Sequence, residues 1–486
     1  MSQIQMVQTA PTAADPFATL DATAQAELVR SGQTSATELV EAAIARIEAT
    51  NGALNAVTHK LYDQARRHAA GAPGAGPFAG VPFLIKDLLS MAGDPNTMGC
   101  RALASAVASE SSPYAAALDA AGLVVVGRTN TPEFGLIDTT EPKLFGPTHN
   151  PWDLARSPAG SSGGAGAAVA AGMTPMAHAS DGGGSIRLPA CNNGVFGLKP
   201  SRGRNRSAGM PPPAFGLPAI GVDHALTRSV RDSALLLSLT EDPETPLGRL
   251  GLVRDPLARP LRIGLVRVGT GGQRAVAEVD DAALSTARLC ESLGHHVEET
   301  VWPFSGPAVL DAFLDEWMVM ADGIVRMTCA GAGCAADTDH FEPWTLELAR
   351  RGAALPPARI AEVVTVLTLA TEALDAFFDT CDVLLSPVLR HLPKPLGDHA
   401  TDLPFETLFE RVVDNVAYTP VFNVAGTPAM SVPLNWSAGG LPIGSQFAAR
   451  VGGEATLLGL AYQLEAARPW AGRWAPHSYP AVAGRP

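Results

Sequence analysis

The residues of this chain best suited to chemistry are two serines in glycine-rich backbone and one lysine in an apolar run. Ser161 and Ser185 lie 24 positions apart, within the stretches 158–165 and 181–187, and Lys86 closes the apolar run upstream of them. A serine hydroxyl becomes a nucleophile when a neutral amine removes its proton, and this pairing needs no histidine. The combination therefore indicates an acyl-transfer site with a lysine as the base.

Ser185 directly follows three glycines, Gly182, Gly183 and Gly184. Glycine accepts positive φ and lets backbone N–H groups approach a ligand closely. Successive N–H groups in such a turn can hold developing negative charge. One loop would then supply both a nucleophile and its oxyanion hole. The alternative is that the glycines and the serine only make a tight turn.

Ser162 stands at the centre of a Gly-x-Ser-x-Gly pattern, which is typical of the nucleophile elbow of α/β-hydrolases. That motif requires a strand immediately before the serine, and residues 153–159 do not have the pattern of a strand. A phosphate-binding P-loop is also disfavoured, because no Gly-Lys-Ser/Thr follows. The elbow therefore remains the weaker hypothesis for this stretch.

Lys86 is surrounded in sequence by Phe83, Leu84 and Ile85 on one side and by Leu88 and Leu89 on the other. A lysine in such a place snorkels, pairs with a carboxylate, or loses its hydration, and lost hydration lowers its pKa. Asp87 faces the other side of the expected strand and need not neutralise it. Taken alone, a structural lysine is the more ordinary interpretation.

The elements that must position these residues alternate between strands and helices. A capping box at Ser35–Glu38 begins one helix, and an alanine-rich helix follows the first serine stretch. Residues 261–301 suggest a strand, a helix and a further strand. Further strands are expected at 81–89, 123–126, 382–385 and 429–433. This alternation predicts an α/β fold with a mixed, largely buried sheet.

Composition excludes several classes of protein. Of the 486 residues, 46% are hydrophobic and 17% charged, which does not fit a disordered chain, and the net charge of −13 disfavours nucleic acid as a partner. The N-terminus has no signal-peptide pattern, and no apolar run reaches membrane-spanning length. The six cysteines form no CxxC pair, so a reduced, cytoplasmic setting is expected and a Cys329–Cys334 disulfide is not. His295 and His296 are expected in a surface loop.

The motifs of Lys86, Ser161 and Ser185 belong to a larger set of stretches, 80–87, 127–135, 150–153, 157–164, 181–190, 194–201, 422–429 and 440–444. With this set the chain resembles the amidase signature family over roughly residues 20 to 470. The resemblance implies the fold of that family, a central mixed, twisted β-sheet covered by helices on both faces.

The resemblance also implies a role for each motif residue. Ser185 would be the nucleophile, Ser161 a bridging serine held by a cis peptide bond, and Lys86 the neutral base. The N–H groups of Gly182, Gly183, Gly184 and Ser185 would form the oxyanion hole. A supporting hydrogen-bond network would consist of Ser162, Asp181 and Arg187. The resemblance implies no cofactor and no metal.

Three positions depart from the pattern of the family. Ala159 stands where glycine is frequent, and Ala165 stands where serine is frequent. Gly182 replaces a threonine that is common in the tRNA-linked members, and this could loosen the oxyanion loop. Neither Ala159 nor Ala165 touches Lys86, Ser161 or Ser185, whereas Gly182 is nearer the chemistry.

The domain prediction is one catalytic domain over 17–475, with tails at 1–16 and 476–486. The signature core would occupy about 60–225 and 380–470, and the substrate-pocket segment about 225–380. An apolar, methionine-lined pocket is expected from Met210, Trp317 and Met320, with ordinary core packing as the alternative. Residues 207–222 are either a mobile lid or a rigid connection.

The resemblance is greatest to the branch with 6-aminohexanoate-cyclic-dimer hydrolases and urethane-cleaving amidases. It implies a serine hydrolase that cleaves small apolar or aryl amides and carbamates through an acyl-enzyme. The alternatives are a nylon-oligomer hydrolase, a subunit of a tRNA-dependent amidotransferase, and a homologue without catalysis. The expected partner is a small amide or carbamate, with neither nucleic acid nor membrane, and a homodimer is expected at the level of the family only.

Overall fold

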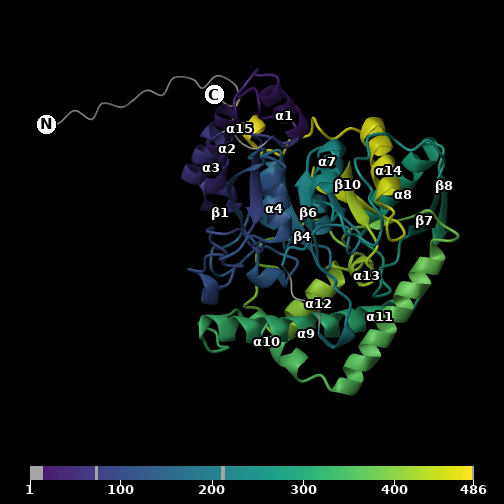
Figure 1. Ribbon diagram of the computed structural model, residues 1–486. Helices are drawn as coiled ribbons and strands as arrows, with labels where there is room; N and C mark the ends of the chain where they lie inside the picture. Colours follow the sequence, from purple (N-terminus) through teal and green to yellow (C-terminus); the bar gives the residue numbers. More distant parts are fainter. Residues whose placement is uncertain (1–14, 72–74, 210–213, 484–486) are drawn as a thin grey trace.

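A computed structural model describes residues 15–71, 75–209 and 214–483. In this part of the chain one eleven-stranded sheet runs through the molecule in the order β1-β3-β2-β4-β6-β5-β10-β11-β9-β7-β8 (Figure 1). Its strands are β1 (Val57–Lys60), β2 (Pro82–Lys86), β3 (Val124–Thr129), β4 (Met176–Asp181), β5 (Phe196–Lys199), β6 (Val222–Thr227), β7 (Arg262–Val266), β8 (His296–Thr300), β9 (Val383–Pro387), β10 (Ala429–Trp436) and β11 (Pro442–Ala448). β2 pairs in parallel with β3 and β4, whereas β4 and β6 are antiparallel, so the predicted mixed sheet is confirmed.

Helices account for most of the remaining chain. The helices of the first half are α1 (Ala22–Arg30), α2 (Ala36–Leu54), α3 (Tyr62–Ala70), α4 (Pro113–Ala120), α5 (Gly163–Ala170), α6 (Arg187–Asn193) and α7 (Val230–Thr240). Those of the second half are α8 (Ala277–Ser292), α9 (Gly306–Ala332), α10 (Pro343–Ala353), α11 (Pro357–Phe377), α12 (Phe405–Asn415), α13 (Pro420–Val424), α14 (Glu454–Ala467) and α15 (Tyr479–Val482). Short 3-10 turns are η1 (Arg101–Leu103), η2 (Glu133–Gly135) and η3 (Ala214–Gly216). The predicted capping box at the start of α2 is present.

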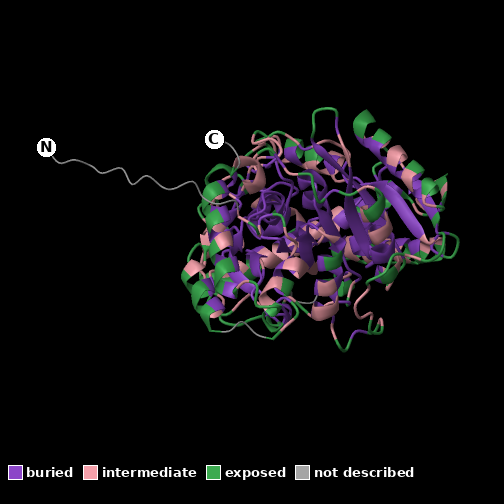
Figure 2. Cartoon of the chain, turned by 90° about the horizontal axis from the view of Figure 1, so that it is seen from above, coloured by how far each residue is buried: buried purple, intermediate pink, exposed green. Residues whose placement is uncertain are grey.

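The strand β2 shows how helices cover both faces of the sheet. Leu84 packs into a buried cluster with residues of α2, α3 and α5. Its neighbours Phe83 and Ile85 pack into a second cluster with residues of α1, α4 and α7. Because side chains alternate across a strand, these clusters lie on opposite faces, and Lys86 shares the face of Leu84. The buried strands and the exposed outer turns of the helices are seen in Figure 2.

One further prediction of local structure is confirmed, and two features of the structure were not predicted correctly. The expected unit at 261–301 is confirmed, because β7 and β8 pair in parallel on either side of α8. No prediction covered β4, since its sequence Met-Ala-His-Ala-Ser-Asp has neither branched residues nor alternation, although it is almost wholly buried. His295 is not in a surface loop: it is buried, and its Nδ1 accepts a hydrogen bond from Leu261 N at 3.0 Å.

The described residues within the two predicted tails make specific contacts with the domain. Asp15 forms an ion pair with the buried Arg46 at 2.7 Å, whereas residues 1–14 lie outside the described part. The predicted C-terminal tail contains α15, and Tyr479 N donates to Ala171 O at 2.8 Å. No helix in the described ranges is both long and apolar enough to cross a membrane.

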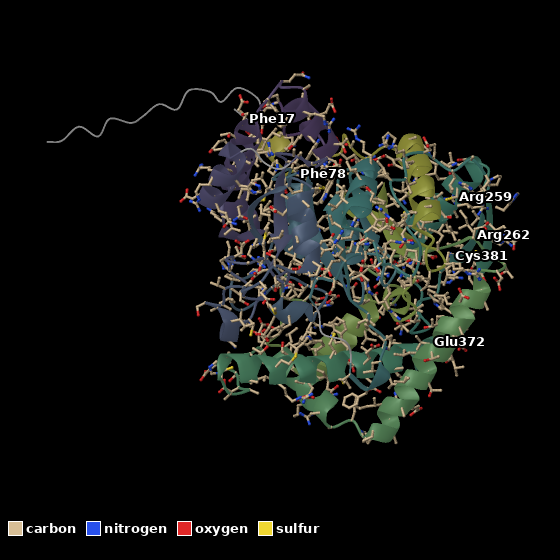
Figure 3. All side chains as sticks on the ribbon, viewed as in Figure 1. Phe17, Phe78, Arg259, Arg262, Glu372 and Cys381 are labelled. Atoms are coloured by element: carbon tan, nitrogen blue, oxygen red, sulfur yellow. The ribbon has the colours of Figure 1, made fainter. Side chains whose placement is uncertain are left out.

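Near the β8 edge, the sheet carries several charged side chains. Arg259 and Arg262 are grouped with Cys381 there, above the end of α11 that carries Glu372 (Figure 3). Both arginines pair with Asp382, at 3.3 and 3.4 Å. These ion pairs link the start of β7 to the residue that precedes β9.

Candidate active site

Lys86 is the last residue of β2, and its side chain is completely buried. Its Nζ donates to Ser161 Oγ at 2.6 Å and to Ser180 Oγ at 2.9 Å. Ser161 lies in the loop before α5, and Ser180 is part of β4. The fold therefore brings the predicted lysine and the first predicted serine into direct contact across 75 positions of sequence.

Burial lowers the pKa of Lys86 to about 7, although the charges of Asp223 and Asp181 act in the opposite direction. An ammonium group that loses its hydration is less stable than the neutral amine. The next residue, Asp87, is engaged elsewhere, because its carboxylate accepts from Arg128 Nε at 2.7 Å. Lys86 is thus suited to act as a base near neutral pH.

The loop that carries Ser161 contains a cis peptide bond between Gly160 and Ser161, as the family resemblance implied. A Cβ on Gly160 would collide with the carbonyl group of Thr139, so a side chain does not fit there. A Cβ on Gly135 would lie 2.9 Å from Ser161 Oγ, and Gly135 lines the pocket into which Ser185 opens. Ser161 Oγ is therefore placed between Lys86 and a wall of that pocket.

Ser162 has a different role from Ser161. Its Oγ donates to Ser180 O at 3.2 Å and accepts from Ser180 N at 3.3 Å, which ties the start of α5 to β4. Residues 153–159, all of which the structure describes, form turns and isolated bridges rather than a strand. The local structure of a nucleophile elbow is therefore missing at Ser162, whose hydroxyl is bound to the main chain of β4.

Ser185 lies in the short loop between β4 and α6, which is built around the carboxylate of Asp181. That carboxylate accepts from the N–H groups of Gly184 at 2.7 Å and Ile186 at 3.1 Å. It also binds the guanidinium of Arg187, with distances of 3.0 and 2.9 Å. Burial raises the pKa of Asp181, but Arg187 outweighs this effect and holds the pKa well below its ordinary value.

The predicted oxyanion hole needs one correction. The N–H of Gly184 is already donated to Asp181, so it is not free to bind a developing oxyanion. Gly184 has a φ of +139°, and a Cβ there would collide with the side chain of Thr419. The remaining candidates are the N–H groups of Gly182, Gly183 and Ser185, and the last two residues line the pocket.

The pocket in front of Ser185 has a volume of about 640 Å³, counting space that opens to solvent. Its walls are aromatic and branched aliphatic side chains of α9, α10 and α12, together with the segment Gly135–Asp138. The aromatic side chains are Phe313, Trp317, Trp344 and Phe409. Such a lining favours uncharged, apolar groups. Within the described ranges, no three metal-ligating side chains gather into a metal site.

Of the predicted pocket residues, Trp317 lines the pocket, and Met320 packs beside it in the apolar core. Met210 lies outside the described residues. The expected methionine lining is wrong for the described part, because no methionine lines the pocket and the share of the wall that α9 contributes is one stripe at positions 310, 313, 314 and 317. This spacing of three and four residues is one helix face, and it holds leucine, phenylalanine and tryptophan.

The sequence analysis did not predict several residues that contact the Ser185 loop. Thr419 Oγ1 donates to Gly183 O at 2.6 Å, and Asn423 Nδ2 donates to Asp181 Oδ1 at 2.9 Å. Gln446 Oε1 accepts from Arg187 Nη1 at 2.7 Å. All three come from the C-terminal part of the chain. The matched stretch 422–429 contains Asn423 and was a usable signal, whereas Thr419 and Gln446 had none.

The comparisons with known proteins agree with this geometry. The profile of the family described as Amidase matches residues 38–458. The Mycobacterium tuberculosis protein AmiC is 40% identical over 476 residues, covering 95% of this chain and 98% of AmiC. A solved structure of 6-aminohexanoate cyclic dimer hydrolase in complex with its substrate has a TM-score of 0.87 at 34% identity, covering 95% of this chain and 99% of that one. A bacterial aryl acylamidase of the amidase signature family has a TM-score of 0.85 at 30% identity, covering 97% and 100%. The chain therefore belongs to the amidase signature family and is a hydrolase of carbon–nitrogen bonds other than peptide bonds.

Proposed function

We propose that the chain hydrolyses small apolar or aryl amides and carbamates through a Ser185–Ser161–Lys86 triad and a covalent acyl-enzyme. The observation that carries this proposal is the 2.6 Å hydrogen bond from the buried Lys86 Nζ to Ser161 Oγ, next to a pocket that Ser185 lines. A neutral amine in this position can accept a proton, and the apolar pocket holds the group next to the scissile bond.

In the first half of the reaction Ser185 Oγ attacks the carbonyl carbon of the substrate. Its proton passes to Ser161 Oγ while the proton of Ser161 passes to Lys86 Nζ, so the net result is a charged lysine and a tetrahedral oxyanion. The N–H groups of Gly182, Gly183 and Ser185 stabilise this oxyanion. When the intermediate collapses, the proton returns through Ser161 to the leaving nitrogen, since an amine leaves poorly unless it is protonated.

In the second half a water molecule attacks the acyl-enzyme and Lys86 again takes up the proton through Ser161. The acid is released and Ser185 regains its hydrogen. A carbamate has a carbonyl group similar to that of an amide, so the same donors serve it. The final products of a carbamate are an alcohol, carbon dioxide and an amine.

The pH dependence of the reaction follows from the state of Lys86. Because the base must be neutral, we expect kcat/KM to rise with pH through about 7, where Lys86 loses its proton, and to level off above that. A profile of kcat/KM against pH with an N-aryl amide measures this limb, since such a substrate does not titrate in that range. A limb near pH 10, where an ordinary lysine titrates, would contradict the role of burial.

The substrate class is tested by the release of arylamine from an N-aryl carbamate and its matched N-aryl amide. We expect release from both by the purified chain alone, and none above background from the Ser185→Ala variant. Release from the amide alone would limit the function to amides. No release from either would contradict the proposal and favour a role that depends on a partner protein.

A second candidate substrate is the cyclic dimer of 6-aminohexanoate. It is favoured by the likeness to the solved hydrolase that is named for this compound, at 34% identity over 95% of the chain. The methylene segments of the dimer suit an aliphatic and aromatic pocket. Appearance of the linear dimer when the purified chain is incubated with the cyclic dimer, and its absence with Ser185→Ala, would support this candidate.

A further inference from the structure

Two side chains behind Lys86 have no part in the proposed reaction. His178 is completely buried on β4, and its Nδ1 accepts a hydrogen bond from the main-chain N–H of Lys86 at 3.3 Å. Because Nδ1 is the acceptor, the neutral ring carries its proton on Nε2. Nε2 then donates to Asp223 Oδ1 at 3.0 Å. The residue that carries the base is thus linked to a carboxylate two strands away.

Asp223 reaches this place because of the sheet topology. It lies on β6, directly opposite Ser180 of β4 in the antiparallel register. Ser180 Oγ accepts a hydrogen bond from Lys86 Nζ, so Asp223 is a cross-strand neighbour of one of the contacts of the amine. The Asp223 side chain is 14% exposed, which leaves it some contact with solvent, whereas Lys86 has none.

The other charges around Lys86 are already paired. Asp181 is bound by Arg187, and Arg128 on β3 is bound by Asp87. Asp223 has no arginine or lysine within ion-pair distance among the described residues. Its negative charge is therefore the one in this neighbourhood that is not offset by a guanidinium group.

The remaining titratable groups packed around His178 are expected to stay uncharged. Tyr114 of α4 lies with its ring 5.5 Å from that of His178, and burial raises the pKa of Tyr114 far above its ordinary value. Burial lowers the pKa of His178, and it lowers the pKa of His224 on β6 to about 3. Within this group, Asp223 is the charge that acts on the amine.

We propose that Asp223 is a positioning residue that sets the pH at which Lys86 becomes a base, through its charge and through its hold on His178. Asp223 is not among the described residues that line the pocket, and its side chain is hydrogen-bonded to His178, so its link to the site runs through His178 and Lys86. The inference rests on the proposed function in one respect, the use of neutral Lys86 as the base.

The test is the titration of Lys86 in the Asp223→Asn variant. Asparagine keeps the shape of the side chain, and its Oδ1 can still accept from His178 Nε2, but the charge is lost. Without that charge the ammonium form is less stable, so we expect the titration midpoint of Lys86 to fall by about 1 pH unit. Asp223→Glu keeps the charge, so we expect the titration midpoint of Lys86 in this variant to lie close to that of the wild type.

The titration is read directly by NMR on protein labelled with ¹³C and ¹⁵N in lysine. The chain has five lysines, and comparison with Lys86→Met assigns the signal of Lys86. In parallel, the acidic limb of kcat/KM should move to lower pH by the same amount, with KM on the plateau unchanged. Asp63→Asn, at an 88% exposed side chain on α3, is the matched control and should change neither measurement.

An unchanged midpoint in Asp223→Asn, or a midpoint that rises, would overturn the inference. If thermal melting shows that this variant does not fold, Asp223→Ser carries the same expectation as a second neutral side chain. The NMR titration also separates the two proposals. If the chain cleaves no amide but the Lys86 midpoint still falls in the variant, the proposed function fails and the control of Lys86 by Asp223 stands.

Discussion

Replacing Ser185 with alanine is expected to lower kcat by about 10⁴-fold or more, because the attacking atom is removed and the remaining groups supply only binding and oxyanion contacts. Ser185 is 8% exposed and opens into the pocket, so the small change should leave the fold intact. Arylamine release under saturating substrate measures the loss. Thermal melting of both proteins checks that the loss is chemical.

The matched control is Ser162→Ala, which removes the hydroxyl of the adjacent glycine-rich stretch. Ser162 Oγ bonds to the main chain of Ser180, so its loss is expected to cost about 1–3 kcal/mol of stability and to reduce activity far less than the loss of Ser185. If Ser162→Ala abolished activity and Ser185→Ala did not, the nucleophile-elbow hypothesis would return and the proposed triad would be wrong.

The residues of the proposed triad could be named from sequence because the motifs that carry the family resemblance are local. A lysine at the end of an apolar run and a serine after three glycines are visible in short windows, and the structure buries Lys86 against Ser161 as expected. The strand that leads into the glycine loop was not visible. β4 is held by its neighbours β2 and β6 rather than by residues with a preference for strands.

The parts of the site that could not be predicted depend on contacts over long distances in sequence. Thr419 touches the loop of Gly183 across 236 positions, and no local pattern marks such a contact. The family resemblance implied a place in the oxyanion hole for the N–H of Gly184. Its actual partner, Asp181, is only three residues away, but the turn that joins them has no signature beyond glycine.

Asp181→Asn is expected to have the second large effect, on stability as well as activity. Asp181 is completely buried, and its carboxylate receives the N–H groups of Gly184 and Ile186 and the guanidinium of Arg187. The asparagine amide lacks the charge that balances Arg187. Its NH₂ group also replaces one carboxylate oxygen, so it faces the N–H donors that this oxygen accepts from in the wild type. Breaking a buried ion pair in this way costs about 3–5 kcal/mol, and displacement of the Ser185 loop should lower kcat by about 100-fold.

The control for this change is Asp402→Asn, which breaks the ion pair of Asp402 with Lys143 at the surface, where the two side chains are 60% and 37% exposed. We expect it to cost less than about 1 kcal/mol in the free energy of unfolding by urea.

The pH dependence of the unfolding free energy separates Asp181→Asn from Asp402→Asn further. Because the pKa of Asp181 is lowered on folding, its contribution is fully present above the unfolded value of 3.8 and is lost only as the pH falls below it. The gap in unfolding free energy between wild type and Asp181→Asn should therefore stay constant from pH 8 to about 5 and narrow only in stronger acid. If the difference in unfolding free energy between wild type and Asp181→Asn is small at pH 7, or already decreases there, Asp181 does not hold the loop through its charge.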